Sequence, residues 1–199
     1  MSKLVGNCEK GLIFIVSAPA GTGKTTLVQR LANEFPDIVP SISYTTRKPR
    51  PREENGKDYF FVSETEFSHR IDNGEFLEHV YLYQDYYGTS ASWVEQKLNE
   101  KKHVILTIDT QGALHLKDKI DPILIFLAPP NLEQLQQRLT QRGTESTSMI
   151  EKRLNWAVEE MKAMEHYDYC VVNDDLNVAY NVLRSIIIAE ERRIRVYRK

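Results

Sequence analysis

A glycine-rich loop near the beginning of the sequence constrains the fold more than any other feature. The apolar run 12–16 has the length of a buried strand, and a helical pattern occupies 24–34. Between them the segment 18–25 reads Ala-Pro-Ala-Gly-Thr-Gly-Lys-Thr. This segment matches the pattern G-x-x-x-x-G-K-[ST], except that Ala18 replaces the first glycine. A strand, this loop and a helix in succession predict a site for the phosphates of a nucleotide.

Each residue type in the loop suits contact with phosphate. Gly21 and Gly23 let backbone N–H groups curl around the anion, and the following helix directs the positive end of its dipole toward it. The Lys24 ammonium then reaches the outer phosphates, while the Thr25 hydroxyl can ligate Mg²⁺. A glycine-rich turn beside a surface lysine is the alternative, but loop, lysine, threonine and flanking elements coincide here. The residues expected to bind the nucleotide phosphates are Ala18, Pro19, Ala20, Gly21, Thr22, Gly23, Lys24, Thr25 and Thr26.

Short apolar runs predict the strands of one parallel sheet. Each run is continuous rather than alternating, as expected for strands that are covered on both faces. Because helical patterns separate the runs, crossover connections are required, and the sequence predicts an α/β fold with a P-loop NTPase core, a parallel sheet flanked by helices. Ligands in such sheets bind at the carboxyl ends of the strands. The runs occupy 12–16, 104–106, 123–127 and 169–172.

The helical patterns between the runs differ in length. A long one opens with Ser148 and Glu151 in the spacing of a capping box. The last one begins at about Asp175 and runs into the basic tail 192–199. The shorter patterns lie at 24–34, 111–117 and 132–139.

Two segments interrupt this alternation. The segment 41–93 is rich in Tyr, Arg, Pro and Glu and has brief strand-like pieces at 59–62 and 76–77, so we expect a small inserted subdomain. The segment 140–147 is polar throughout and lies between two helical patterns, which predicts a mobile lid. A chain of 199 residues suits a single domain with one buried core. The parts assigned to that core are 1–40, 94–139 and 148–199.

The overall composition narrows the class of partner. A net charge of −2 argues against binding of nucleic acid, which usually requires a basic domain. Residues 1–11 lack the apolar region of a signal peptide, and no apolar stretch approaches the roughly 18 residues that span a bilayer. We therefore expect a cytoplasmic protein without a membrane partner. Cys8 and Cys170 lie far apart in the sequence, which favours two reduced thiols over a disulfide framework or a metal site.

Two arginines and two tyrosines in the inserted segment suit a phosphate monoester. Arg47 and Arg50 supply charge-assisted forks, and Tyr59 and Tyr87 supply hydroxyl donors. The segment 43–61 closely resembles the guanylate kinase signature T-[ST]-R-x-x-[KR]-x-x-[DE]-x-x-G-x-x-Y-x-[FY]. The resemblance continues along practically the whole chain through Glu78, 86–89, Asp109, Gln111, Gly112, Arg138, Arg142, 152–154 and 172–175.

Resemblance to guanylate kinases implies transfer of the γ-phosphoryl group of ATP to GMP, with Mg²⁺ accompanying ATP. The substrates would be these two small molecules, and the sequence leaves a monomer and a homodimer both open. By the same resemblance Arg138 lies against the adenine of ATP, with Asn173 nearby. The side chains that would surround the transferring group are Lys24, Arg47, Arg50, Arg142 and Arg153.

The GMP site implied by the resemblance can be checked against the chemistry of guanine. Guanine has donors at N1 and N2 and acceptors at O6 and N7, so Glu78 would accept from the former while Ser43 and Thr89 donate to the latter. Adenine has no N1–H and would leave Glu78 unpaired, which is costly in a buried site. The full set of expected GMP contacts is Ser43, Arg47, Arg50, Tyr59, Glu78, Tyr87, Thr89 and Asp109.

Alternatives remain open for single residues and for the whole chain. Asp109, which the resemblance puts near the metal and the acceptor, has an ordinary alternative as a helix N-cap. Thr107 stands where the family commonly has a second acidic residue. A catalytically inactive guanylate kinase-like module that binds peptides is the competing function, against which the intact Lys24 and Thr25 argue. A P-loop kinase for another acceptor, such as AMP, UMP or dGMP, is a third interpretation.

Overall fold

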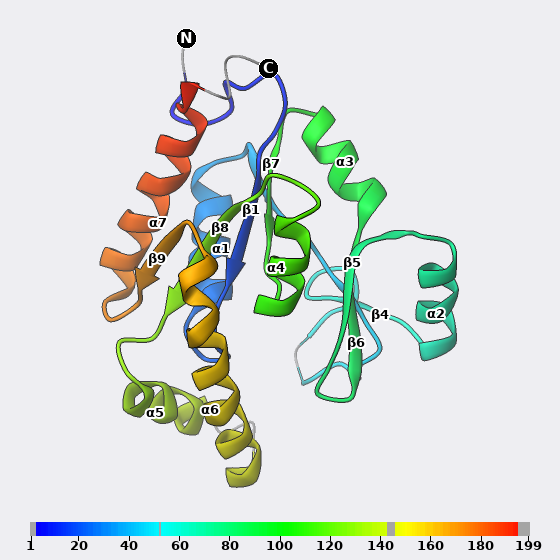
Figure 1. Ribbon diagram of the computed structural model, residues 1–199, viewed down its shortest axis with the longest axis vertical. Coiled ribbons are helices and arrows are strands. Elements are labelled where there is room, and N and C mark those ends of the chain that lie inside the picture. The colour runs from blue at the N-terminus through cyan, green and yellow to red at the C-terminus, as the bar shows by residue number, and fades with distance from the viewer. Residues whose placement is uncertain (1–2, 52, 143–145, 195–199) are drawn as a thin grey trace.

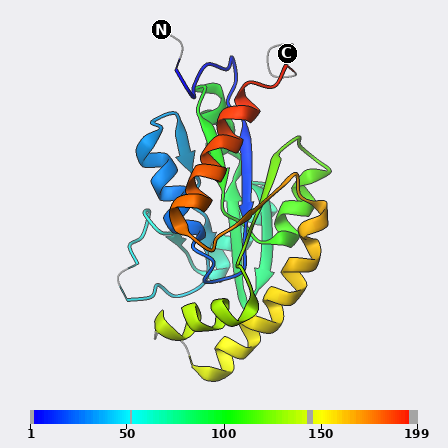
Figure 2. The same ribbon diagram turned by 90° about the vertical axis from the view of Figure 1, so that its left-hand side faces the viewer.

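The computed structural model describes residues 3–51, 53–142 and 146–194 of the 199-residue chain. A five-stranded parallel sheet forms its centre, with helices on both faces (Figure 1 and Figure 2). The four expected strands are present, with bounds that agree to within one residue. Across the sheet the strands are β2 (Ile38–Pro40), β7 (His103–Leu106), β1 (Ile13–Ser17), β8 (Ile123–Ala128) and β9 (Tyr169–Val172).

The edge strand β2 has no counterpart among the expected elements. It is only three residues long and ends in Pro40, whose missing N–H is tolerated at the edge of a sheet. Helix α1 has the expected bounds, whereas α2 and α3 were not expected as helices. The helices of the described residues are α1 (Lys24–Glu34), α2 (Glu64–Asp72), α3 (Ala91–Asn99), α4 (Thr110–Lys117), α5 (Leu132–Arg142), α6 (Thr147–Lys162), the 3₁₀ turn η1 (Ala163–His166) and α7 (Leu176–Glu191).

Side chains that alternate along the strands divide the core into two layers. On one face of the sheet, Phe14 and Val16 of β1 pack in a cluster with residues of α1 and α7. On the other face, Ile15 packs with residues of α3 and α4. These three β1 residues are at most 1% exposed. Strand β1 is therefore fixed from both sides, and the glycine loop that follows it starts from a rigid support.

Helix α6 begins earlier than the sequence pattern indicated. The Ser146 hydroxyl accepts a hydrogen bond from the Met149 N–H at 3.3 Å, which makes Ser146 the N-cap. The expected capping box of Ser148 and Glu151 is therefore wrong, because both residues lie inside the helix. A helix N-terminus with serines two residues apart offers two candidate caps, and the spacing alone selected the wrong one.

The helices also shorten the segment that was expected to be irregular. Helix α5 continues through 140–142, and α6 starts at Thr147. Residues 143–145, the middle of the expected lid, lie outside the described residues. At the other end of the chain, α7 ends at Glu191 with Arg192 as its C-cap, so the expected continuation into the basic tail stops there; 195–199 are likewise outside the described part.

A second, four-stranded sheet lies to one side of the main sheet, together with α2 (Figure 1). It is mixed: β3 runs parallel to β4 and antiparallel to β6, which forms a hairpin with β5. Phe67 of α2 is fully buried and stacks on Phe76 at 4.5 Å and on Tyr86 at 5.3 Å. This small sheet therefore has an aromatic core of its own. Its strand order is β4 (Phe60–Phe61), β3 (Tyr44–Thr45), β6 (Asp85–Ser90) and β5 (Phe76–Leu82).

A buried carboxylate joins the N-terminal segment to the last helix. Glu191 of α7 accepts hydrogen bonds from the N–H groups of Gly6 at 2.7 Å and Asn7 at 2.8 Å. It also forms a hydrogen bond with Nε2 of His103 on β7, at 2.8 Å. Glu191 and His103 are both fully shielded from solvent, so these hydrogen bonds satisfy polar groups that water cannot reach.

Both cysteines are free thiols, as expected. Cys8 lies beside His103 and Glu191, and the potential ligand atoms of the three lie within 4.8 Å of one another. The Leu12 N–H donates to His103 Nδ1 at 3.0 Å, which leaves the ring proton on the Nε2 that faces Glu191. Hydrogen bonds engage both nitrogens of the His103 ring and both oxygens of Glu191. These residues therefore hold the N-terminal segment against β7 and α7. Among the described residues, no helix is long and apolar enough to cross a membrane.

Candidate functional site

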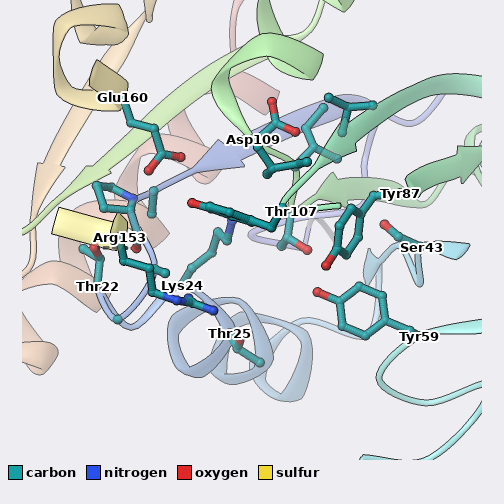
Figure 3. Close-up of a pocket in the computed structure, with 18 of the residues that line it drawn as sticks. Thr22, Lys24, Thr25, Ser43, Tyr59, Tyr87, Thr107, Asp109, Arg153 and Glu160 are labelled. Carbon is teal, nitrogen blue, oxygen red and sulfur yellow. Dashed lines mark hydrogen bonds between the residues drawn. The ribbon is translucent and has the colours of Figure 1, made fainter. Parts of the chain in front are cut away.

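A pocket of about 260 Å³ lies between the carboxyl ends of β1 and β7 and the small sheet. Figure 3 shows Lys24 entering it from the glycine loop, while Ser43, Tyr59 and Tyr87 face it from the small sheet. Most of the expected site residues meet here. Those that line the pocket are Ala18, Pro19, Ala20, Gly21, Thr22, Gly23, Lys24, Thr25, Thr26, Ser43, Arg47, Arg50, Tyr59, Glu78, Tyr87, Asp109 and Arg153.

The backbone of the glycine loop is held in a conformation that requires glycine. Gly23 has φ of 94°, and a Cβ built on it would lie 2.6 Å from Asn173 Nδ2. That Asn173 amide donates to the Thr22 carbonyl at 2.6 Å, and the Thr22 hydroxyl donates to the Pro19 carbonyl at 2.7 Å. Asn173 therefore holds the loop from behind in this structure, a contact that the sequence alone did not reveal.

Lys24 begins α1 and lies half-buried in the pocket. Burial lowers the pKa of its ammonium, while the nearby carboxylates of Glu160 and Asp109 act in the opposite direction. Thr25 and Thr26, the next two residues, are exposed at the N-terminus of the helix. A cation and the positive end of a helix dipole thus converge on one part of the pocket, which suits an anion.

On the opposite side, a carboxylate fixes the arginine of the signature segment. Glu53 accepts two hydrogen bonds from the Arg47 guanidinium, both at 3.0 Å, and one from the Arg50 N–H at 2.7 Å. Burial alone would raise the pKa of Glu53, but these hydrogen bonds outweigh it and lower the pKa. The Arg47 guanidinium also lies 5.3 Å from the centre of the Tyr59 ring. Glu53 was not among the expected site residues, yet it sets the direction in which Arg47 points.

Glu78 on β5 is only 4% exposed and has one oxygen satisfied within the protein. The Thr89 hydroxyl donates to Glu78 Oε1 at 2.7 Å, whereas Oε2 has no hydrogen-bond partner in the described structure. Burial raises the pKa of Glu78 to about 7, opposed by the Thr89 hydrogen bond and aided by the charge of Asp109. Thr89, expected to donate to a ligand, instead donates to Glu78 and does not line the pocket. A buried carboxylate oxygen without a partner is suited to N–H donors of a ligand.

Asp109 is a helix N-cap that also lies at the pocket. Its Oδ1 accepts from the N–H groups of Gln111 at 2.7 Å and Gly112 at 3.0 Å, so it is the N-cap of α4. Asp109 also lines the pocket, beside Thr107 (Figure 3). Its capping bonds leave the residue partly exposed at the pocket, so the N-cap role does not prevent contact with a ligand.

The remaining expected residues either lie behind the pocket or have side chains that the structure does not describe. Arg138 of α5 donates to the Asn173 carbonyl at 2.9 Å, and neither residue lines the pocket. Arg142 is the last residue of α5, and its side chain is outside the described structure. Sequence reasoning missed Tyr83 and Glu160, which both line the pocket. Glu160 lies seven residues after Arg153, on the same face of α6, so that spacing was a usable signal for it.

Comparisons with known proteins agree with one another. A protein-family model described as guanylate kinase matches residues 10–190. A guanylate kinase of Protochlamydia amoebophila is 57% identical over 191 residues, which cover 96% of this chain and 97% of that protein. A guanylate kinase of Chlamydia felis is 48% identical over 182 residues, covering 91% and 89%. The crystal structure of guanylate kinase from Anaplasma phagocytophilum superposes with a TM-score of 0.78 at 31% identity, covering 94% of this chain and 89% of that one. The expected α/β P-loop fold is thereby confirmed.

Proposed function

The chain belongs to the guanylate kinase family, and we propose that the pocket between its two sheets holds ATP on the glycine-loop side and GMP on the small-sheet side. The protein transfers the γ-phosphoryl group of ATP to GMP, giving ADP and GDP. One observation carries the assignment of the two sides. A single pocket is lined by the phosphate loop at one end and by arginines, tyrosines and a buried carboxylate at the other.

At the acceptor end, Arg47 and Arg50 would bind the phosphate of GMP with Tyr59 and Tyr87. A dianionic phosphate suits two guanidinium groups, because planar N–H forks match its oxygens. The pairing of Arg47 with Glu53 supports this role, since it fixes the guanidinium before a ligand arrives. Preorganisation of this kind lowers the entropic cost of binding.

The guanine base would be recognised by Glu78 and Ser43. The unpartnered Oε2 of Glu78 is the natural acceptor for N1–H and N2–H of guanine. Thr89 would hold the carboxylate in place through its 2.7 Å hydrogen bond rather than contact the base from the pocket surface. Adenine offers no such donors, so AMP would leave the buried oxygen unsatisfied.

At the donor end, the segment 18–26 would surround the phosphates of ATP, with Lys24 at the β- and γ-phosphates. The Thr25 hydroxyl stands exposed at the first turn of α1, and an oxygen donor in that place fits Mg²⁺, which prefers oxygen ligands. Mg²⁺ would neutralise charge on the phosphates. Arg138 and Asn173, joined by a hydrogen bond behind the loop, would face the adenine side.

Catalysis would rest on positioning and charge rather than on a nucleophilic side chain. Lys24, Arg47, Arg50 and Arg153 line one pocket, and Arg142 would join them from the end of α5. Because water must be excluded from the γ-phosphate, we propose that the subdomain 41–93 and the lid 140–147 close over the core 1–40, 94–139 and 148–199. Small-angle scattering that is identical with and without both nucleotides would contradict closure.

The cellular setting follows from the same chemistry. ATP, GMP and Mg²⁺ are cytoplasmic solutes, and we propose a cytoplasmic enzyme that acts as a monomer or homodimer. Nucleic acid and membrane are not among its proposed partners, in line with the net charge of −2.

A coupled assay of ADP release tests the proposal. GMP, dGMP, AMP, UMP and CMP are compared with ATP and Mg²⁺ present. We expect turnover with GMP, slower turnover with dGMP, and activity with the other acceptors lower by at least about a hundredfold. Absence of turnover with every acceptor would favour the inactive peptide-binding module instead.

A further inference from the structure

The turn between β5 and β6 is built from two residues in an unfavourable backbone conformation. Tyr83 has φ of 55° and Gln84 has φ of 72°, in the left-handed region that favours glycine or asparagine. Both residues are exposed enough that burial does not force this conformation; Tyr83 is 41% exposed. Strain that persists at a pocket is a reason to ask what the side chain does there.

The Tyr83 ring spans the gap between the small sheet and the main domain. Its centre lies 5.8 Å from the Trp156 ring, tilted by 60°, and 5.8 Å from the Arg153 guanidinium carbon. Arg153 and Trp156 are three residues apart on α6 and so share one face of that helix. The hairpin of the small sheet therefore meets α6 at the turn that carries Arg153, and the Tyr83 ring takes part in this contact.

The surroundings of Tyr83 favour a role for the ring rather than for a phenolate. Tyr83 is partly exposed, but burial of the part that lines the pocket raises the pKa of its hydroxyl; the carboxylate of Glu160 adds to the effect, while Arg153 opposes it. The hydroxyl thus stays neutral. A neutral aromatic face attracts a guanidinium electrostatically and limits the directions in which it points. Figure 3 shows Arg153 and Glu160 on the α6 side of this pocket.

We propose that Tyr83 is a positioning residue for the phosphoryl transfer: its ring, held by the strained turn, seats against Arg153 and Trp156 and directs the Arg153 guanidinium into the pocket. Movement of the small sheet toward α6 would then align the arginine in the same step as GMP is enclosed. This inference rests on the proposed role of Arg153 in the transfer. Tyr83 touches neither reacting atom, so its contribution reaches the reaction only through the arginine.

A double-mutant cycle separates this role from simple packing. Turnover is measured at saturating ATP and GMP for Tyr83→Ala, Arg153→Ala and the double variant, with Tyr83→Phe as the variant that keeps the ring. We expect Tyr83→Ala to lower kcat by about tenfold with the KM for ATP changed by less than about twofold, and Tyr83→Phe to stay within about twofold of the unsubstituted protein. The double variant should be no slower than Arg153→Ala alone.

Tyr81→Ala is the matched control, because Tyr81 lies on the same hairpin, is 59% exposed and packs on Tyr86 outside the pocket. Its kcat should be unchanged. Tyr83→Leu replaces Tyr83→Ala if the alanine variant does not fold. Additive losses in the double variant, or equal losses in the alanine and phenylalanine variants, would overturn the proposal. Full activity of Arg153→Ala would overturn it too, while GMP turnover by that variant would leave the kinase function standing.

A fluorescence measurement reports the contact directly. The chain has two tryptophans, so Trp93→Phe leaves Trp156 as the single reporter beside the Tyr83 ring. ADP and GMP added together should change the Trp156 emission, and the change should vanish in Tyr83→Ala but persist in Tyr83→Phe. An unchanged response in Tyr83→Ala would show that the ring is not what meets α6 when the nucleotides bind.

Discussion

The glycine loop and the small-sheet side of the pocket position the groups that would bind a ligand by different means. The loop uses backbone: its shape comes from positive φ angles at Gly21 and Gly23, and a single amide, that of Asn173, holds it from behind. The small sheet uses side chains, and two of them are held by polar partners within the protein. Arg47 is held by Glu53, and Glu78 by Thr89.

This difference has a consequence for how each side tolerates change. Backbone N–H groups remain when a side chain is replaced, so most substitutions in the loop act through shape. A side-chain site loses a contact directly and also leaves the former partner as a buried polar group, which adds a desolvation cost. Lys24 is the exception on the loop side, because its charge is delivered by a side chain.

Lys24→Ala should therefore give the largest effect. Loss of the ammonium at the transferring phosphoryl group is expected to lower kcat by about a thousandfold. The rest of the loop is backbone, so ATP should still protect the variant against thermal unfolding. Lys57→Ala is the control, since the Lys57 side chain is 71% exposed and pairs with the exposed Glu54. A loss of ATP protection equal to the loss of turnover would contradict a backbone-built loop.

Arg47→Ala should come next, with Glu53→Gln testing the partner. We expect kcat/KM for GMP to fall by about a hundredfold in Arg47→Ala and by about tenfold in Glu53→Gln, because the amide still accepts one hydrogen bond but no longer carries charge. Glu54→Gln, one residue further along, removes an exposed carboxylate and should have no effect. Equal kinetics for the two glutamine variants would show that Arg47 needs no partner.

Glu78→Gln should change the pH dependence of stability. Burial raises the pKa of Glu78 from its ordinary 4.5 to about 7, so between these values the folded protein holds a proton that the unfolded chain releases. Stability of the ligand-free protein therefore falls as pH rises through this window. Urea unfolding at pH 5 and pH 8 should show a fall that is smaller in Glu78→Gln by up to about 3 kcal/mol. Burial also raises the pKa of Glu160 to about 7, so Glu160 contributes to the pH dependence in the same direction.

The same variant should bind GMP more weakly, by about tenfold to a hundredfold in KM, because the neutral amide loses the charge-assisted hydrogen bonds that a carboxylate forms with N1–H and N2–H. In the unsubstituted protein the KM for GMP should decrease as pH rises from 6 to 8, when Glu78 ionises. An identical pH profile for both proteins would remove Glu78 from base recognition.

Gln84→Gly should give the smallest effect, and in the stabilising direction. At φ of 72° a glycine relieves strain of about 1 kcal/mol, partly offset by its greater freedom in the unfolded chain. We expect a rise of about 0.5 kcal/mol, or one to two degrees in the unfolding midpoint. Gln96→Gly, in the interior of α3, should instead destabilise by about 1 kcal/mol. Destabilisation by both glycines would mean that the turn carries no strain.

How well the sequence predicts a feature of this structure depends on how close together in the sequence the residues that determine it lie. Helix α1 was predicted correctly because the glycine loop directly before it marks its start and the end of its apolar pattern marks its last turn. Helix α2 begins with Ser63, whose hydroxyl accepts from the Glu66 N–H at 3.1 Å, so a readable capping signal was overlooked there. Short strands such as β3, with two residues, carry too little pattern to be recognised.

Within the pocket, the sequence indicated most of the residues that line it, but not the residues with which they form hydrogen bonds. The signature segment indicated Arg47 as a site residue, but not its pairing with Glu53. Two residues six positions apart in a loop show no periodicity that would predict such a pair. The pairing of Glu78 with Thr89 depends on the register of the β5–β6 hairpin, which a bulge shifts between Phe76 and Glu78. Register is set by the folded sheet, so the sequence pattern could not reveal that Thr89 would donate to Glu78.

The buried Glu191 joins the two ends of the chain, which determines when this contact can form. Its hydrogen bond to the Asn7 N–H joins residues 184 positions apart, and loop-closure entropy makes such a contact late to form. During synthesis the N-terminal segment must therefore wait for α7 before its amides find their acceptor, while β1 and the glycine loop can already pack on α1. The Glu191 network therefore fastens the first residues of the chain to its last helix only after synthesis has passed α7.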